Sequence, residues 1–186
     1  MPNQLPAETI DTKQKILRAA AQIINSAGVM ALTLEAVAKE ARISKGGLLY
    51  HFPSKDALMK GMNDYLLQRF VAEVEDAAKQ DPVEEGKWTR AYTSVTFRQL
   101  DDEIDINVAF LAAAATNPDL LRAMAKQMQA LQAHIENDHI DPIISTVIRL
   151  AVDGMYFNQL YGADLQEDAC EKVLNHLISL TKEATA

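Results

Sequence analysis

The chain has 186 residues, 48% of them hydrophobic and 24% charged, with a formal net charge of −8. This composition excludes a disordered chain, and no apolar run reaches the roughly 18–20 residues that cross a bilayer. The N-terminus lacks the basic and apolar stretches of a secretory signal, and the lone Cys170 has no internal disulfide partner, so we expect a cytoplasmic protein with no membrane contact.

The charge is unevenly distributed along the chain. Residues 1–55 hold seven Lys and Arg against four Asp and Glu, whereas residues 56–186 hold 11 against 22. A surplus of +3 beside a deficit of −11 is typical of a polyanion-binding unit attached to an acidic one. We therefore treat residues 1–55 as a head domain and residues 56–186 as a body domain.

The head is predicted to hold three helices. Apolar residues at helical spacing indicate the first, over about residues 11–27. Thr33 and Ser44 are suitable N-caps for two short helices joined by a tight turn, the second over about 45–52. A much longer helix, about 55–79, then leads into the body.

The body is also predicted to be helical, because no segment alternates with period two. Capping and breaking residues divide it into about five more helices, with breaks near Asp81-Pro82, Asp101-Asp102, Asn117-Pro118, Asp141-Pro142 and Gly162. The fold class is therefore all-α, with a three-helix helix-turn-helix head followed by a helical domain.

The segment SKGGLLYHF suits the second helix of a helix-turn-helix, which enters the major groove of DNA. Ser44 and Lys45 lie at its N-terminus, where free N–H groups favour phosphate. Gly46 and Gly47 allow the backbone to approach bases closely, although each weakens the helix by roughly 1 kcal/mol. Tyr50 can donate a hydrogen bond to a phosphate.

The stretch TLEAVAKEARISKGGLLYHFPSKDAL, with the preceding KQKILRAAAQIINSAGV, resembles the signature of the TetR family of transcriptional regulators. The likeness covers about residues 12–60 and implies a homodimer, by family default a repressor, that binds double-stranded palindromic operator DNA. It also implies, by position, the DNA-facing residues: Thr33, Ser44, Lys45, Gly46, Gly47, Tyr50, His51 and Lys55.

Two residues depart from the pattern of that family. Arg42 occupies a turn position where glycine is usual, so a residue with a Cβ is expected to have a positive φ. Leu49 stands where tyrosine is often found, so either one phosphate contact is lost or Leu49 belongs to the core. Thr33 and Lys55 also have simpler alternative roles, as a helix cap and a solvated cation.

The last two helices, about 142–160 and 166–183, are predicted to form the dimer interface. Pairs of apolar helices from two subunits can assemble into a four-helix bundle, although the same faces could pack inside one monomer. The predicted interface residues are Ile143, Val147, Leu150, Leu174, Leu177 and Ile178.

The middle helices are predicted to enclose a small apolar or aromatic effector. Methionine fills irregular and adaptable spaces, and the alternative is an ordinary core. The candidate ligand residues are Met59, Met62, Phe97, Phe110, Met124, Met128, Met155 and Tyr156.

No glycine-rich phosphate loop, nucleophile elbow or paired CxxC occurs, so we predict neither an enzyme nor a cofactor. The Glu-x-x-His spacing of di-iron bundles occurs once, at Glu136 and His139, where His134, Asp138 and Asp141 also gather. A solvated helix end explains this group better than a metal site. The alternative function is a helical small-molecule- or metal-binding protein that no longer binds DNA.

Overall fold

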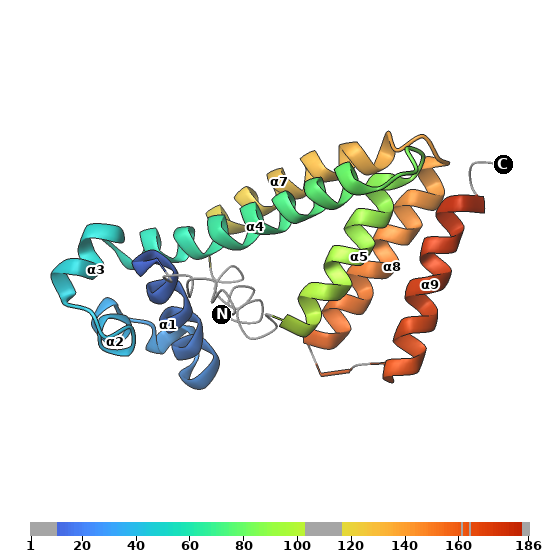
Figure 1. The fold of residues 1–186 in the computed structure, drawn as a ribbon. Helices are drawn as coiled ribbons and strands as arrows, with labels where there is room; N and C mark the ends of the chain where they lie inside the picture. The colour runs from blue at the N-terminus through green and yellow to red at the C-terminus, as the bar shows by residue number, and fades with distance from the viewer. Residues whose placement is uncertain (1–10, 103–116, 161, 164, 184–186) are drawn as a thin grey trace, which may run out of the picture.

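The computed structural model describes residues 11–102, 117–160, 162–163 and 165–183. These segments contain no strand, which confirms the all-α prediction. Figure 1 shows the three short N-terminal helices gathered at one end and the body helices at the other, joined by a long helix. The elements are α1 (Thr12–Ala27), the 3₁₀ turn η1 (Val29–Ala31), α2 (Leu34–Glu40), α3 (Lys45–His51), α4 (Lys55–Gln80), α5 (Lys87–Asp102), α7 (Pro118–Glu136), α8 (Pro142–Leu160) and α9 (Glu167–Glu183).

Side-chain caps set the starts of the short head helices, as the sequence predicts. The Thr33 hydroxyl accepts a hydrogen bond from the Ala36 N–H at 3.1 Å, and the Ser44 hydroxyl accepts one from the Gly47 N–H at 3.0 Å. Each cap satisfies a donor that the first turn of a helix leaves free. The turn between the two helices places Arg42 at a φ of 56°, which confirms the positive φ expected there.

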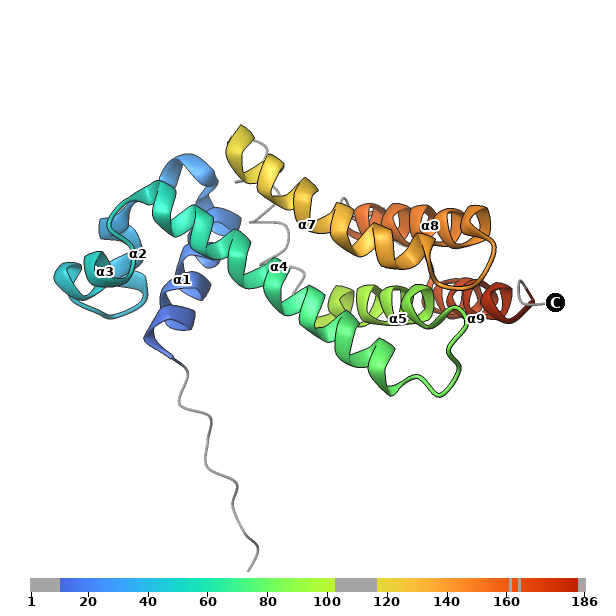
Figure 2. The same ribbon diagram turned by 90° about the horizontal axis from the view of Figure 1, so that it is seen from above.

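Two hydrophobic cores share the helix α4. The head core packs α1, α2 and α3 against the first half of α4 and includes Leu120 near the start of α7. The body core packs the second half of α4, from Val74 onward, against α5, α7, α8 and α9. Figure 2 shows α4 running from the head to the body, with α7 also approaching the head. The boundary at residue 55 stays a prediction, since the head core continues past it.

The end of the body remote from the head is fastened by two polar residues. The buried Asp138 carboxylate, from the loop after α7, accepts hydrogen bonds from the backbone N–H groups of Trp88 and Thr89 at 3.0 and 2.7 Å. It therefore caps α5 from a distant part of the chain. The buried Arg90 bonds to Asp81 at 2.8 Å and to the Thr181 hydroxyl of α9 at 3.2 Å.

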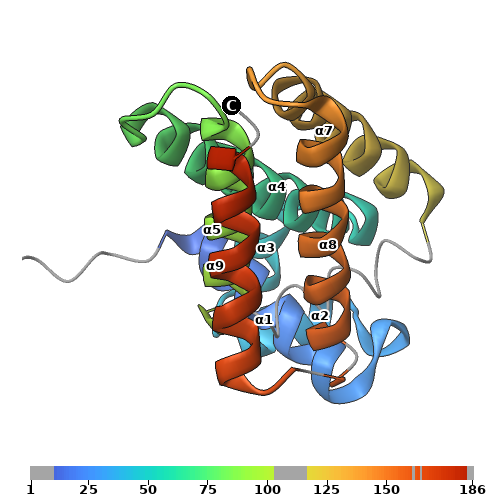
Figure 3. The same ribbon diagram turned by 90° about the vertical axis from the view of Figure 1, so that its right-hand side faces the viewer.

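The helices α8 and α9 form an outer face of the body. Figure 3 shows them side by side, with α5 behind them. Within the described segments, no helix combines the length and apolar character that a membrane span requires.

Candidate nucleic-acid interface

The helix α3 is held in the head by one side and presents its other side to solvent. Leu48 and Phe52 are buried in the head core. A Cβ on Gly61 of α4 would lie 2.3 Å from Phe52 Cε1, so the glycine makes room for that ring. Lys45 and Tyr50 are exposed on the opposite side, Tyr50 at 86%. The helix is thus rigidly placed while its outer face is free to contact another molecule.

The exposed face of α3 carries a cation and two aromatic rings. Lys45 Nζ lies 3.1 Å from Glu35 Oε1 of α2, and both side chains are mostly solvated. Such surface ion pairs are weak, so this one orients Lys45 without holding it. The rings of Tyr50 and His51 meet edge to face, with centroids 5.2 Å apart. Hydroxyl, imidazole and ammonium groups together offer donors suited to phosphate oxygens.

Gly46 lies on the same exposed face. A Cβ built at this position would meet nothing within 4 Å, so packing within the monomer does not require glycine there. The low helix propensity of Gly46 therefore has no structural compensation inside the chain. A molecule that approaches the backbone closely from outside would supply the missing reason.

Two of the predicted DNA-facing residues also have roles within the head. Thr33 is exposed but its hydroxyl caps α2. Lys55 is half-buried, and its ammonium group donates to the Val29 carbonyl at 3.1 Å, fastening α4 to η1. Leu49 is 39% exposed, so it does not belong to the core. These positions leave the DNA contacts of Ser44, Lys45, Gly46, Gly47, Tyr50 and His51 as predictions that the exposed face accommodates.

Sequence reasoning missed two cations beside this face. Lys39 of α2 and Arg42 in the turn are both exposed, and neither side chain has an ion pair within the described part of the chain. The only signal in the sequence was the positive surplus of the head, to which both residues contribute.

The predicted ligand residues are divided between the two cores. Met59 and Met62 are buried in the head core, and Met124 packs against it. Phe97 and Met128 instead pack against the body core. Met155 and Tyr156 are half-buried on α8, where burial raises the pKa of Tyr156 to about 12. Phe110 lies outside the described residues. The described members therefore do not line a single cavity.

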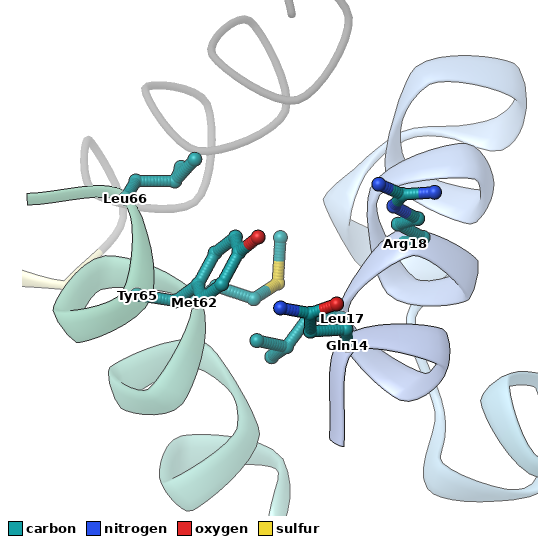
Figure 4. A pocket seen from close by; sticks show the side chains of 6 residues that line it. All are labelled: Gln14, Leu17, Arg18, Met62, Tyr65 and Leu66. Carbon is teal, nitrogen blue, oxygen red and sulfur yellow. The ribbon is translucent and has the colours of Figure 1, made fainter. Parts of the chain in front are cut away.

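A small hollow lies between α1 and α4, at the junction of head and body (Figure 4). Its accessible volume is about 10 Å³, room for about one water molecule. Met62 is its one residue from the predicted ligand set, and the hollow is too small for an effector. The lining residues are Gln14, Leu17, Arg18, Met62, Tyr65 and Leu66.

The predicted interface residues on α8 form an exposed apolar stripe. Ile143 is 73% exposed, and Val147 and Leu150 are each 55% exposed, at spacings of four and three residues. The exposed Gly154 and Phe157 continue the same spacing and were missed by sequence reasoning.

The predicted interface residues on α9 are less accessible. Leu177 is buried in the body core, and Leu174 and Ile178 are half-buried. Packing inside the monomer, the alternative for these faces, therefore applies to Leu177.

The acidic and histidine residues near Glu136 serve the fold. Both carboxylate oxygens of Asp138 are occupied by donors from Trp88 and Thr89. The ring of His134 stacks on Trp88 with centroids 4.2 Å apart. Among the residues that the structure describes, no group of three or more His, Cys, Asp or Glu is placed to hold a metal ion.

Comparisons with known proteins identify both parts of the chain. Residues 16–62 match the family model described as bacterial regulatory proteins, tetR family. Residues 86–182 match the model described as tetracyclin repressor-like, C-terminal domain.

Individual relatives agree with these models. The A-factor receptor protein of Streptomyces griseus is 25% identical over 147 residues, which cover 78% of this chain and 53% of that protein, so the match spans about half of the relative. A transcriptional regulator from Rhodococcus sp. Rha1 has a TM-score of 0.74 at 19% identity, over 95% of this chain and 99% of that one. A TetR-family transcriptional regulator from Streptomyces coelicolor has a TM-score of 0.73 at 19% identity, over 94% and 96%. At these identities the solved structures establish the fold.

Proposed function

Because this chain belongs to the TetR family of transcriptional regulators, we propose that it is a homodimeric repressor released from a palindromic operator by a small effector. The observation that carries the proposal is the exposed face of α3, which bears Lys45, Gly46 and Tyr50 and is fixed to the head core from behind. No observation favours the alternative of a helical protein that has lost DNA binding.

In this proposal, α3 lies in the major groove and α2 crosses the DNA backbone. Lys45, Tyr50 and His51 contact phosphates, while Gly46 allows close approach of the backbone to the bases. Arg42, exposed in the turn before α3, adds a phosphate contact that the sequence did not predict. Lys55 is left out of the contact set, because its ammonium group is bound to the Val29 carbonyl.

The dimer would place two copies of α3 about one DNA turn apart, roughly 34–36 Å. The exposed stripe on α8 supports this assembly, because its spacing of four and three residues is the one that lets two helices pack knobs into holes. Gly154 on the stripe would let the two helices approach closely, since a Cβ there meets nothing within 4 Å.

Small effectors would act through α4, the helix that both cores share. A ligand that prefers a body conformation with badly spaced heads lowers operator affinity by its coupling free energy, typically ~1–3 kcal/mol. We propose an apolar or aromatic effector, because the body interior is lined mainly by apolar and methionine side chains. The name of the A-factor receptor protein, which denotes a receptor, supports a ligand-responsive body.

The proposed function is tested by selection from the genomic DNA of the host. Fragments would be incubated with the purified ligand-free protein at moderate salt, and the retained fragments sequenced. We expect enrichment of a palindrome with half-site centres about 10 base pairs apart. Retention of random fragments, or of none, would contradict the proposal.

Replacing Gly46 with alanine is expected to stabilise the protein while weakening operator binding. Alanine favours a helix over glycine by up to about 1 kcal/mol, and its methyl group meets no atom of the head. The same methyl group would project toward the bases. Thermal melting and operator titration of one sample would show the opposite changes; unchanged operator affinity would mean that the backbone at this position stays clear of DNA.

Replacing Leu150 with glutamate is expected to convert the dimer to a monomer. A charge on the α8 stripe would have to be buried against its counterpart in the second subunit, which is strongly unfavourable. Sedimentation would measure the change in mass, with Leu121→Glu on α7 as the control, because Leu121 is similarly exposed but lies off the stripe. An L150E protein that remains dimeric, or an L121E protein that dissociates equally, would place the interface elsewhere.

A further inference from the structure

Three oxygen atoms inside the body have no hydrogen-bond partner. They are Asn63 Oδ1 on α4, Thr96 Oγ1 on α5 and Gln127 Oε1 on α7. Asn63 is 0% exposed and Thr96 is buried, so solvent does not satisfy these atoms. The unpaired polar atoms of Gln132 and Arg149 differ, because those side chains hold Glu136 and Asp153 through their other nitrogens. We call Asn63, Thr96 and Gln127 the polar layer.

Each residue of the polar layer interrupts the inward face of its helix. On α7, Gln127 stands one turn after Met124 of the head core and one turn before Leu131 of the body core. On α4, Asn63 likewise stands one turn after the buried Met59 and one turn before the buried Leu67.

The third residue faces the same way. Thr96 lies two turns along α5 from Thr89, whose hydroxyl points at Asp138 in the loop after α7. Because residues seven apart share one side of a helix, Thr96 is on the side of α5 that faces α7. The helices α4, α5 and α7 pack against one another, as Figure 1 shows for α4 and α7, so the polar layer lies where the two cores meet.

An unpaired buried oxygen is costly, and native proteins contain few of them. Three on neighbouring helices indicate that a partner supplies donors when it is bound. An ionised carboxylate offers only acceptors and would meet oxygen atoms in a domain with a net charge of −11. Hydroxyl and N–H groups match all three oxygens.

We propose that the polar layer recognises the effector, which carries two or more hydroxyl or N–H donors on its apolar or aromatic frame. This inference rests on the proposed function, and it narrows the effector class to neutral or cationic donors. Asn63, Thr96 and Gln127 then select the ligand, while the surrounding apolar side chains supply the burial.

The first test measures the ligand-free protein. Thr96→Val keeps the shape of the side chain and removes the unpaired oxygen, so we expect a melting temperature about 2–4 °C higher. The matched control is Thr89→Val on the same helix, which removes a hydroxyl bonded to Asp138 and should lower the melting temperature. Equal destabilisation by both variants would show that Thr96 already has a partner, such as a buried water, and would overturn the proposal.

The second test uses three probes on one benzene frame: resorcinol, its dimethyl ether and isophthalate. Millimolar resorcinol should raise the melting temperature of the native protein, whereas the ether and the dicarboxylate should not. The resorcinol shift should disappear in Thr96→Val and in Gln127→Met. A shift with the ether as large as with resorcinol, an unaltered shift in these variants, or no shift with resorcinol would each overturn the proposal.

The two hypotheses fail separately. Genomic selection uses the ligand-free protein, so an enriched palindrome with no donor-selective shift would reject the polar layer and keep the repressor. A donor-selective shift without any enriched DNA would reject the repressor and keep the polar layer.

Discussion

Replacing Lys45 and Tyr50 together with alanine is expected to weaken operator binding about 100-fold without altering the fold. Each side chain would lose a hydrogen bond to a charged phosphate, worth about 1.5 kcal/mol, and about 3 kcal/mol corresponds to roughly 100-fold. The fold should persist, because both side chains are exposed and Leu48 and Phe52 hold α3 in place. Operator titration with purified dimer, beside thermal melting, measures both quantities.

The salt dependence of binding separates a phosphate contact from a general loss of charge. Removing one phosphate-bound cation should reduce the slope of log affinity against log salt by about 1 per contact. The matched control is Lys79→Ala, which removes the same charge from an exposed position at the body end of α4. Equal losses from Lys79→Ala and from the double variant would mean that α3 does not contact DNA.

The head could be predicted closely from its sequence because its structure is local. Caps at Thr33 and Ser44, the turn at Arg42 and the buried Leu48 all lie within a short segment. The role of Lys55 could not be predicted in the same way. Its partner is the Val29 carbonyl, 26 residues earlier, and only the packing of α4 on η1 brings the two together.

The body could be predicted as a set of helices but not as a set of contacts. Helical spacing identifies the apolar faces of α8 and α9, yet it does not distinguish the exposed Leu150 from the buried Leu177. That difference depends on which neighbouring helix covers each face. The polar layer escaped prediction for the same reason, because a lone asparagine or threonine in a helix gives no sign that it is buried and unpaired.

The same long-range packing indicates how an effector signal would travel. Leu120 and Met124 of α7 pack with the head core, while Leu131 and Ile135 of the same helix belong to the body core. The head is therefore fastened to the body by α7 as well as by α4. A ligand at the polar layer would lie between these two connections and could change the angle between them.

Replacing Arg90 with alanine is expected to destabilise the protein by about 3–5 kcal/mol, because it leaves the partners of a buried ion pair without donors. Besides Asp81 and Thr181, the guanidinium binds the carbonyls of Val83 and Glu85, at 2.7 and 2.8 Å. Burial alone would raise the pKa of Asp81, but hydrogen bonds from Arg90 and from the Val83 N–H outweigh it and lower the pKa.

A carboxyl group with a lowered pKa stabilises the folded state above its unfolded-state pKa, and that contribution is lost as the pH falls through the folded-state value. The Arg90→Ala protein should therefore melt about 10 °C lower near neutral pH and show a smaller further loss in acid than the native protein. The control is Arg122→Ala, since the ion pair of Arg122 with Asp119 is exposed and should contribute little. Because Arg90 joins the loop after α4 to α9, the variant should also loosen the fixed end of α4 and reduce the response of operator binding to an effector. A native-like melting temperature for Arg90→Ala would show that the apolar body core alone fastens that end.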